Sequence, residues 1–234
     1  MDEVRGRIAR AAGRAGRDPG SVVLVGAVKT VPEALIREAL SLGLADLGES
    51  RVQEAEVRVG AIGRGAARWH MIGHLQRNKC GRAVELFDRV HGVDSVGLAE
   101  ALSRRAVEAG RRLSVLVEVN VSGETTKFGA APDAVAGLLE RVAVLPGLAL
   151  DGLMTVGAPA GTAEEARPGF ARLRALRDAG ERALGLRLPE LSMGMSGDYD
   201  VAVEEGATLV RVGTALFGER SSPGRDWRCS SSVT

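Results

Sequence analysis

Short runs of apolar residues alternate with longer segments of helical periodicity along most of the chain. The first run spans residues 22–30 and reads VVLVGAVKT, in which six of the first seven residues are apolar. A run of this kind, rich in β-branched side chains, is typical of a strand that is buried on both faces. Lys29 stands at its carboxyl end, and Pro32 follows at a position that suits the first turn of a helix.

The same alternation continues down the chain. Further strands are predicted at residues 44–47, 69–72, 89–93, 113–121, 148–154, 188–192 and 208–212. Helices are predicted at residues 2–16, 32–42, 50–60, after Gln76, and at 95–110, 132–145, 162–183 and 198–205. The pattern predicts a single-domain (β/α)8 TIM barrel over residues 1–220, with an open doubly wound sheet as the alternative. The last helix is expected after Phe217, and the serine-rich residues 221–234 are expected to form a disordered tail.

Composition and charge narrow the class of protein. A hydrophobic fraction of 45% with 26% charged residues is typical of a soluble globular protein, and a formal net charge of +1 gives no sign of a nucleic-acid binder. No apolar run reaches the roughly 18 residues of a membrane span, and the first 20 residues lack the apolar centre of a signal peptide. Cys80 and Cys229 are far apart and belong to no CxxC pair, so they form no disulfide framework, which agrees with a reducing compartment. We therefore expect a cytoplasmic protein with neither a membrane nor a nucleic acid as partner.

The carboxyl ends of parallel barrel strands meet on one rim, where the ligands of such barrels bind. Lys29 stands there after the first strand, and the loops after the last two strands, LSMGMSGDYD and LVRVGTALFG, bring Ser192, Gly213 and Thr214. Small residues in these two loops let backbone N–H groups and hydroxyls close around a phosphate. A phosphate pocket beside a lysine predicts a phosphorylated carbonyl compound as the ligand.

The reactivity of Lys29 depends on its surroundings. A lysine attacks a carbonyl only as the free amine, so burial or a neighbouring cation is needed to favour that form. Arg211, in the apolar strand LVRVG, would supply the cation if it pointed into the barrel, and its parity with Leu209 and Gly213 allows this. The pattern equally allows Arg211 to pair with a carboxylate in the outer layer of the barrel.

Six segments carry a resemblance to a known family. Between about residues 4 and 220 they read, in order, GAVKTVP, LGESRVQEA, WHMIGHLQRNK, VLVEVNVSGETTKFG, LDGLMTVG and LSMGMSGDYDVAVEEGATLVRVGTALFG. They resemble the pyridoxal 5′-phosphate (PLP) homeostasis protein family, single-domain relatives of the barrel domain of alanine racemases. The resemblance implies a PLP-binding protein that stores, buffers or delivers the cofactor without catalytic turnover.

The resemblance also implies roles for individual residues. Lys29 would form the internal aldimine with the aldehyde of the cofactor. Arg211 would face the pyridine nitrogen, where a permanent positive charge discourages ring protonation and weakens the cofactor as an electron sink. Three residues would hold the phosphate and a fourth would pack beside them: Ser192, Gly213 and Thr214, with Met193.

Three further positions bear on this comparison. The family usually has asparagine and an aromatic residue where this chain has Ser50 and Arg51, so Ser50 would offer the cofactor a shorter hydroxyl in place of an amide. Many bacterial members carry a second lysine where this chain has Val31, so any transfer role of that lysine is absent. Lys127, in ETTKFG, matches a family lysine near the rim and is included among the predicted cofactor-binding residues.

Other interpretations fit the sequence less well. His70 and His74 have the spacing of metal ligands on a helix, but they lie in a predicted strand and loop without an HExxH motif, so no metal site is predicted. The alternative function is a PLP-dependent amino-acid racemase or another aldimine-dependent enzyme. Racemases add a second domain with a catalytic tyrosine, whereas the single tyrosine here is Tyr199. A Schiff-base aldolase would need its lysine on a later strand than Lys29.

The same resemblance bears on partners. The racemase's second domain contributes its usual dimer interface, and this chain lacks that domain, so we expect a monomer. If the protein delivers PLP, its candidate partners are the apo-enzymes that require the cofactor.

Overall fold

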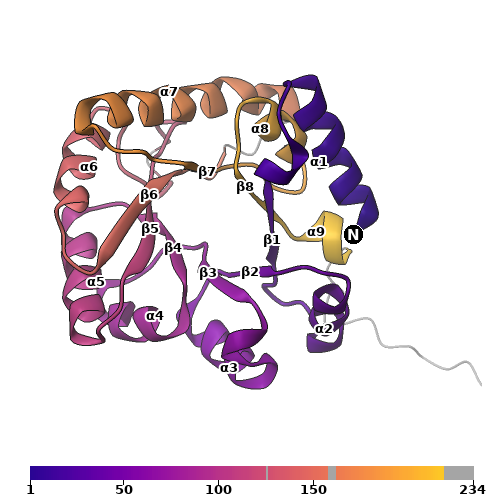
Figure 1. Ribbon diagram of the computed structural model, residues 1–234, viewed down its shortest axis with the longest axis horizontal. Coiled ribbons are helices and arrows are strands. Elements are labelled where there is room, and N and C mark those ends of the chain that lie inside the picture. Colours follow the sequence, from indigo (N-terminus) through magenta and orange to yellow (C-terminus); the bar gives the residue numbers. More distant parts are fainter. Residues whose placement is uncertain (125, 158–161, 219–234) are drawn as a thin grey trace, which may run out of the picture.

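Eight parallel strands close into a barrel in the order in which they occur along the chain, with the last hydrogen-bonded to the first. The computed structural model describes residues 1–124, 126–157 and 162–218. In Figure 1 the strands form an inner ring and the helices surround it. The predicted (β/α)8 barrel is confirmed, and the alternative of an open doubly wound sheet is wrong.

The elements are short and alternate regularly. The strands are β1 (Val23–Ala27), β2 (Asp46–Glu49), β3 (Arg68–Met71), β4 (Arg89–Val93), β5 (Leu113–Glu118), β6 (Leu148–Met154), β7 (Glu190–Ser192) and β8 (Leu209–Val212). The α-helices are α1 (Asp2–Arg14), α2 (Glu33–Ser41), α3 (Val52–Ile62), α4 (Cys80–Leu86), α5 (Val96–Glu108), α6 (Val135–Ala143), α7 (Arg167–Leu184), α8 (Tyr199–Glu204) and α9 (Thr214–Phe217). Short 3-10 turns lie at Pro19–Ser21, Arg64–Ala66, Arg77–Lys79 and Ala163–Ala166.

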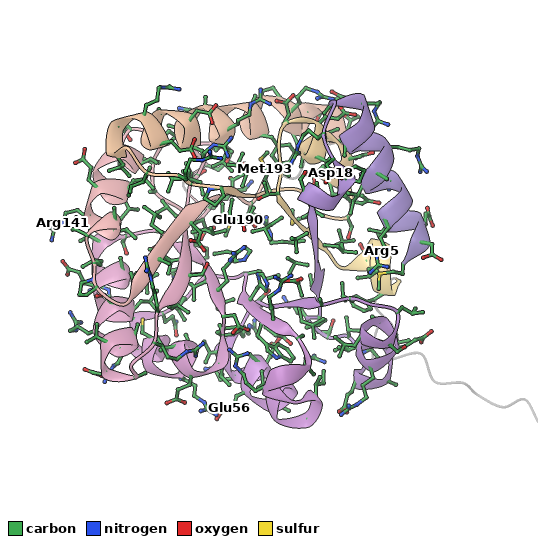
Figure 2. All side chains as sticks on the ribbon, in the orientation of Figure 1. Arg5, Asp18, Glu56, Arg141, Glu190 and Met193 are labelled. Atoms are coloured by element: carbon green, nitrogen blue, oxygen red, sulfur yellow. The ribbon has the colours of Figure 1, made fainter. Side chains whose placement is uncertain are left out.

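Apolar side chains form two separate clusters. The larger one fills the space between the strands and the helices, where Trp69, Phe87 and Leu102 are completely buried. The smaller one lies inside the barrel and consists of Val25, Leu116, Met154 and Leu209. Because this inner cluster is small, the rest of the barrel interior is available to polar side chains. In Figure 2, Glu190 lies near the ring of strands, whereas Arg141 and Glu56 lie at the outer edge.

The helix α1 precedes the barrel and packs outside the strands. Val4, Ile8, Ala11 and Ala12 are buried on one of its faces, as the helical spacing predicts. It lies beside α8 (Figure 1), and Arg7 pairs with Asp200 of α8 at 2.9 Å. Among the described residues, no helix is both long enough and apolar enough to cross a membrane.

β4 and β6 have their predicted bounds, β3, β5, β7 and β8 differ by one to three residues at one or both ends, and β1 and β2 differ most. β1 ends at Ala27, and the chain turns over residues 28–31, with Thr30 at a positive φ of 61°. Lys29 therefore lies in a turn two residues beyond the strand. β2 begins at Asp46, two residues later than predicted, because Leu44 belongs to the outer core whereas Asp46 turns its carboxylate into the barrel.

A helix was predicted after Phe217, where all residues but Gly218 lie outside the described part of the chain. The last helix that the structure describes is α9. It lies at Thr214–Phe217, immediately after β8, where helix-forming residues are followed by Gly218 at a φ of 83°. The predicted tail at residues 221–234 lies outside the described residues.

Candidate functional site

Strand register brings the ends of β1, β2 and β8 together on the carboxyl rim. Ala27 pairs with Gly48, and Gly26 pairs with Val212. The segments that follow these strands are therefore neighbours, and they carry four of the predicted residues: Lys29, Ser50, Gly213 and Thr214. A Cβ atom on Gly213 would lie 3.4 Å from the carbonyl oxygen of Ala27, so the loop after β8 contacts the end of β1.

Lys29 is an exposed side chain on this rim. The hydroxyl of Thr30 donates a hydrogen bond to the Lys29 carbonyl at 2.6 Å, which stabilises the turn. Within the described part of the chain, the Lys29 ammonium has no hydrogen-bond or ion-pair partner. The structure thus presents a primary amine that a ligand can approach without first breaking an ion pair.

Arg211 points into the barrel, which decides between the two orientations that the sequence allowed. It is only 4% exposed, and its Nη1 donates to the Ser192 hydroxyl at 2.5 Å while Nη2 donates to the Thr155 carbonyl at 2.8 Å. Burial lowers the pKa of Arg211 to about 10, against the opposing effect of Glu118 and Asp198. The guanidinium is therefore still a cation at neutral pH, in the interior below the rim.

The loops after β7 and β8 meet through a hydroxyl that the sequence prediction did not select. Ser196 Oγ accepts hydrogen bonds from the backbone N–H groups of Gly213 at 3.1 Å and Ala215 at 3.3 Å. Gly194 allows the first loop to pack on α8, because its φ is 90° and a Cβ there would lie 2.5 Å from Ala202 Cβ. Thr214 is exposed beside these donors. This arrangement of N–H groups and hydroxyls suits an anion.

Ser192 and Met193 lie deeper than the loop in which a phosphate was expected. Ser192 is completely buried, and its hydroxyl contacts Arg211 and, at 2.8 Å, Nδ1 of His91. Met193 is completely buried in the outer core. The phosphate contacts of these two residues stay predictions. The signal for Ser196 was present as the second serine of LSMGMS, but the order of the residues did not show which serine faces the rim.

Ser50 and Lys127 lie in different surroundings. Ser50 is half-buried and lines a pocket of about 410 Å³, together with residues of the β3–α4 loop. Gly73 of that loop packs directly on Ser50, because a Cβ on Gly73 would lie 2.4 Å from the Ser50 carbonyl oxygen. The Lys127 ammonium donates to the Gly157 carbonyl at 3.1 Å and pairs with Glu124 at 3.0 Å.

The interior also holds polar residues that the sequence prediction did not assign to the site. Asp46, His70 and His91 are buried and joined by two contacts of 2.9 Å, one between the imidazoles and one from His70 to Asp46. Glu118, at the end of β5, is 5% exposed, and its Oε2 has no hydrogen-bond partner in the structure. Burial, reinforced by Asp94, raises the pKa of Glu118 to about 7.

The remaining histidine and the tyrosine lie outside this interior group. His74 stacks on Phe128 with ring centroids 3.9 Å apart and lies 3.4 Å from Asp94. Among the described residues, no three metal-ligating side chains are grouped closely enough to hold a metal ion. Tyr199 is buried in the outer core, where the Arg7 guanidinium of α1 lies 4.5 Å from its ring centroid. The tyrosine is thus on the helix side of the strands.

Comparison with known proteins identifies the relatives of this chain. The family model of the alanine racemase N-terminal domain matches residues 5–221. The pyridoxal phosphate homeostasis protein of Aquifex aeolicus is 44% identical over 220 residues, covering 94% of this chain and 96% of that protein. The structure of PipY from Synechococcus elongatus, with PLP bound, is 40% identical with a TM-score of 0.80 and covers 91% of this chain and 100% of PipY.

A more distant similarity concerns the fold alone. D-threonine aldolase from Filomicrobium marinum is 22% identical with a TM-score of 0.72, and the match covers 92% of this chain but 60% of the aldolase. The family model and the identity to the Aquifex protein extend over nearly the whole chain. This chain therefore belongs to the pyridoxal phosphate homeostasis protein family, which shares the barrel of the alanine racemase N-terminal domain.

Proposed function

We propose that this protein binds PLP at the carboxyl rim, holds it as a Schiff base on Lys29, and stores, buffers or delivers it without catalytic turnover. The observation that carries the proposal is the buried Arg211 guanidinium, which lies below a rim that also presents the exposed Lys29 side chain and two backbone N–H groups held by Ser196 Oγ. The PLP-containing PipY structure, 40% identical over nearly its whole length, supports the choice of ligand.

The groups on the rim fit the chemistry of this ligand. PLP carries an aldehyde, a phosphate and a pyridine nitrogen, and when bound it would supply an electrophilic carbon and an electron-withdrawing ring. The Lys29 amine suits the aldehyde. The phosphate suits the donors around Gly213, Thr214 and Ser196, because N–H groups and hydroxyls bind anions well. Ser50 and Lys127 are proposed as additional contacts at the rim, with Ser192 and Met193 acting from the layer beneath.

The position of Arg211 favours holding the cofactor over turning it into a catalyst. A cation facing the ring nitrogen opposes its protonation, and the ring is then a poorer acceptor of electrons from a bound amine. The racemase alternative would use a tyrosine as acid or base, but Tyr199 packs under Arg7 on the outer side of the strands. We propose that the protein acts as a monomer, with PLP-requiring apo-enzymes as recipients.

The test uses absorbance, borohydride reduction and peptide mapping. Wild-type protein mixed with PLP should develop a visible band, and reduction should fix the cofactor on Lys29. The chain contains three lysines, Lys29, Lys79 and Lys127, so the mapping has only two competing positions. Lys29→Ala should abolish the band, whereas Lys79→Ala should retain it.

The outcomes distinguish storage of PLP from catalysis, and they distinguish Lys29 from Lys79 and Lys127 as the site of attachment. Absence of a band at saturating PLP, or an adduct on Lys79 or Lys127 alone, would show that the proposal is wrong. Racemisation of an amino acid by the loaded wild-type protein, lost in Lys29→Ala, would replace the storage function with the enzymatic alternative.

A further inference from the structure

A line of hydrogen-bonded polar side chains crosses the interior of the barrel from one rim toward the other. It joins Arg211, Ser192, His91, His70 and Asp46 through contacts of 2.5, 2.8, 2.9 and 2.9 Å, in that order. All five residues are at most 4% exposed. Ser192 belongs to β7 and His91 to β4, two strands that are not neighbours in the barrel, so their contact spans the interior.

The two ends of this line determine the direction of every hydrogen bond in it. The guanidinium of Arg211 can only donate, so Ser192 Oγ accepts from it, and the single Ser192 hydroxyl hydrogen is left to donate to His91 Nδ1. His91 must then carry its hydrogen on Nε2 and donate to His70 Nδ1. His70 in turn donates from Nε2 to the Asp46 carboxylate, which can only accept.

Protonation of the histidine pair is unfavourable for two reasons. An added proton on the histidine pair would turn His91 Nδ1 into a donor to Ser192 Oγ, and the Ser192 hydroxyl hydrogen would lose its acceptor. It would also place a positive charge in a buried site. Burial lowers the pKa of His70, despite the opposing Asp46, and lowers the pKa of His91 well below its ordinary value. Both imidazoles are therefore neutral with a single defined tautomer.

The charged groups around the line reinforce this state. Arg68 pairs with Asp46 at 2.7 Å at the amino end of the strands, and its own side chain is 63% exposed. Burial opposes the ionisation of Asp46, but the hydrogen bonds from His70 and Arg68 outweigh it and lower the Asp46 pKa. Arg89, Arg68 and Arg211 act on the two histidines as positive charges, and Glu118 and Asp198 act on Arg211 as negative ones.

We propose that Asp46, His70, His91 and Ser192 are positioning residues for Arg211: they form one directed hydrogen-bond chain that fixes the guanidinium beside the ring nitrogen of PLP. None of the first three needs to touch the cofactor to do this. The chain also connects the environment of the ring to Asp46 and the exposed Arg68 at the opposite rim. This inference rests on the proposed function, because it takes Arg211 to face the cofactor ring.

The first experiment tests the chain in the protein without PLP, so it does not depend on the proposed function. The sequence contains three histidines, which makes the imidazole signals of a ¹⁵N-histidine-labelled sample readily assignable. His70 and His91 should both appear as neutral Nε2–H tautomers throughout pH 6–8, with His74 as the reference outside the chain. A protonated Nδ1 on either residue, or a mixture of tautomers, would overturn the proposal.

The second experiment tests the coupling to the cofactor. Asp46→Asn and His91→Leu should shift the pH dependence of the PLP absorbance band and weaken PLP binding about tenfold, the effect of losing one hydrogen bond of moderate strength. Met154→Leu, a volume-conserving change in the inner apolar cluster, is the matched control and should change neither the pH dependence of the band nor the affinity for PLP. If a variant does not fold, Arg68→Met offers a milder change at an exposed side chain and should shift the band in the same direction.

The failure of this inference is distinguishable from failure of the proposed function. If wild-type protein forms no PLP band, the proposed function is wrong and with it the role of the chain toward PLP. If the wild type forms the band and the Asp46, His91 and Arg68 variants all keep its pH profile, the chain does not position Arg211 for the cofactor.

Discussion

Glu118 predicts an unusual dependence of folding stability on pH. Burial raises its pKa from an ordinary 4.5 to about 7 in the folded protein, so between these two values the folded state holds a proton that the unfolded state has released. Because the folded state then binds more protons, stability falls as pH rises through this window. At about 1.36 kcal/mol for each pH unit, the full contribution is about 3 kcal/mol, which is present below pH 4.5 and is lost as the pH rises to about 7.

The assay is urea denaturation of the cofactor-free protein at intervals between pH 5 and pH 8. Glu118→Gln removes the titrating group and should flatten this part of the profile, so that the variant gains about 2–3 kcal/mol relative to wild type between the two ends. The comparison uses the slope of unfolding free energy against pH. Burial of the glutamine amide also costs free energy, but this cost is the same at every pH and does not affect the slope. Glu140→Gln, at an exposed position of α6, is the control and should follow the wild type. Parallel profiles for wild type and Glu118→Gln would refute the reasoning.

Three further substitutions test the loop after β7 and the helix α8 that follows it. Gly194→Ala should lower the free energy of unfolding by about 2–3 kcal/mol, because Gly194 has a positive φ and a Cβ there would lie 2.5 Å from Ala202 Cβ. Gly197→Ala is the control and should cost under about 1 kcal/mol, because the space around Gly197 is open. Equal costs in urea denaturation would contradict this account. Tyr199→Phe removes a buried hydroxyl that has no hydrogen-bond partner among the described residues. Thermal unfolding should therefore show stability unchanged or up to about 1 kcal/mol higher, and the PLP band should be unaffected. A clear loss of stability would reveal a partner for that hydroxyl, and a lost band would connect Tyr199 to the cofactor site.

The fold could be predicted because hydrophobic periodicity determines most of it. β6, with the sequence LALDGLM, was predicted at its observed bounds because it is a mostly apolar run flanked by helical segments. β4, with the sequence RVHGV, was also predicted at its observed bounds, although Val90 and Val93 are its two apolar side chains. β2 was misplaced because its first residue, Asp46, is a carboxylate that points into a polar interior, and a polar residue there breaks the pattern expected of a buried strand. The turn at Lys29 was missed because its apolar neighbours extend the strand pattern past Ala27.

The candidate site could be predicted less completely, and the reason is geometric. Sequence order indicates which residues follow a strand, but it does not show which of them face the rim, the interior or the helices. Ser192, the last residue of β7, and Ser196, in the loop that follows, are four residues apart, yet the first lies within the barrel and the second contacts the rim. The line from Arg211 to Asp46 joins residues of five strands, and its central contact connects two strands that are distant in the sequence. A contact between residues so distant in the sequence cannot be predicted from a local sequence pattern.

The polar interior is difficult to explain by stability alone. Well-packed hydrophobic residues in place of buried charged and polar groups often leave a protein equally or more stable, because each buried polar group loses its water. Yet the interior of this barrel contains Asp46, two histidines and Arg211, all hydrogen-bonded, beside a small apolar cluster. Glu118, whose Oε2 has no hydrogen-bond partner among the described residues, lies at the carboxyl end of β5. The polar groups inside the barrel are thus hydrogen-bonded, whereas Glu118 at the carboxyl rim has an oxygen without a partner among the described residues. This arrangement is expected of an interior that is organised around a ligand bound at the rim.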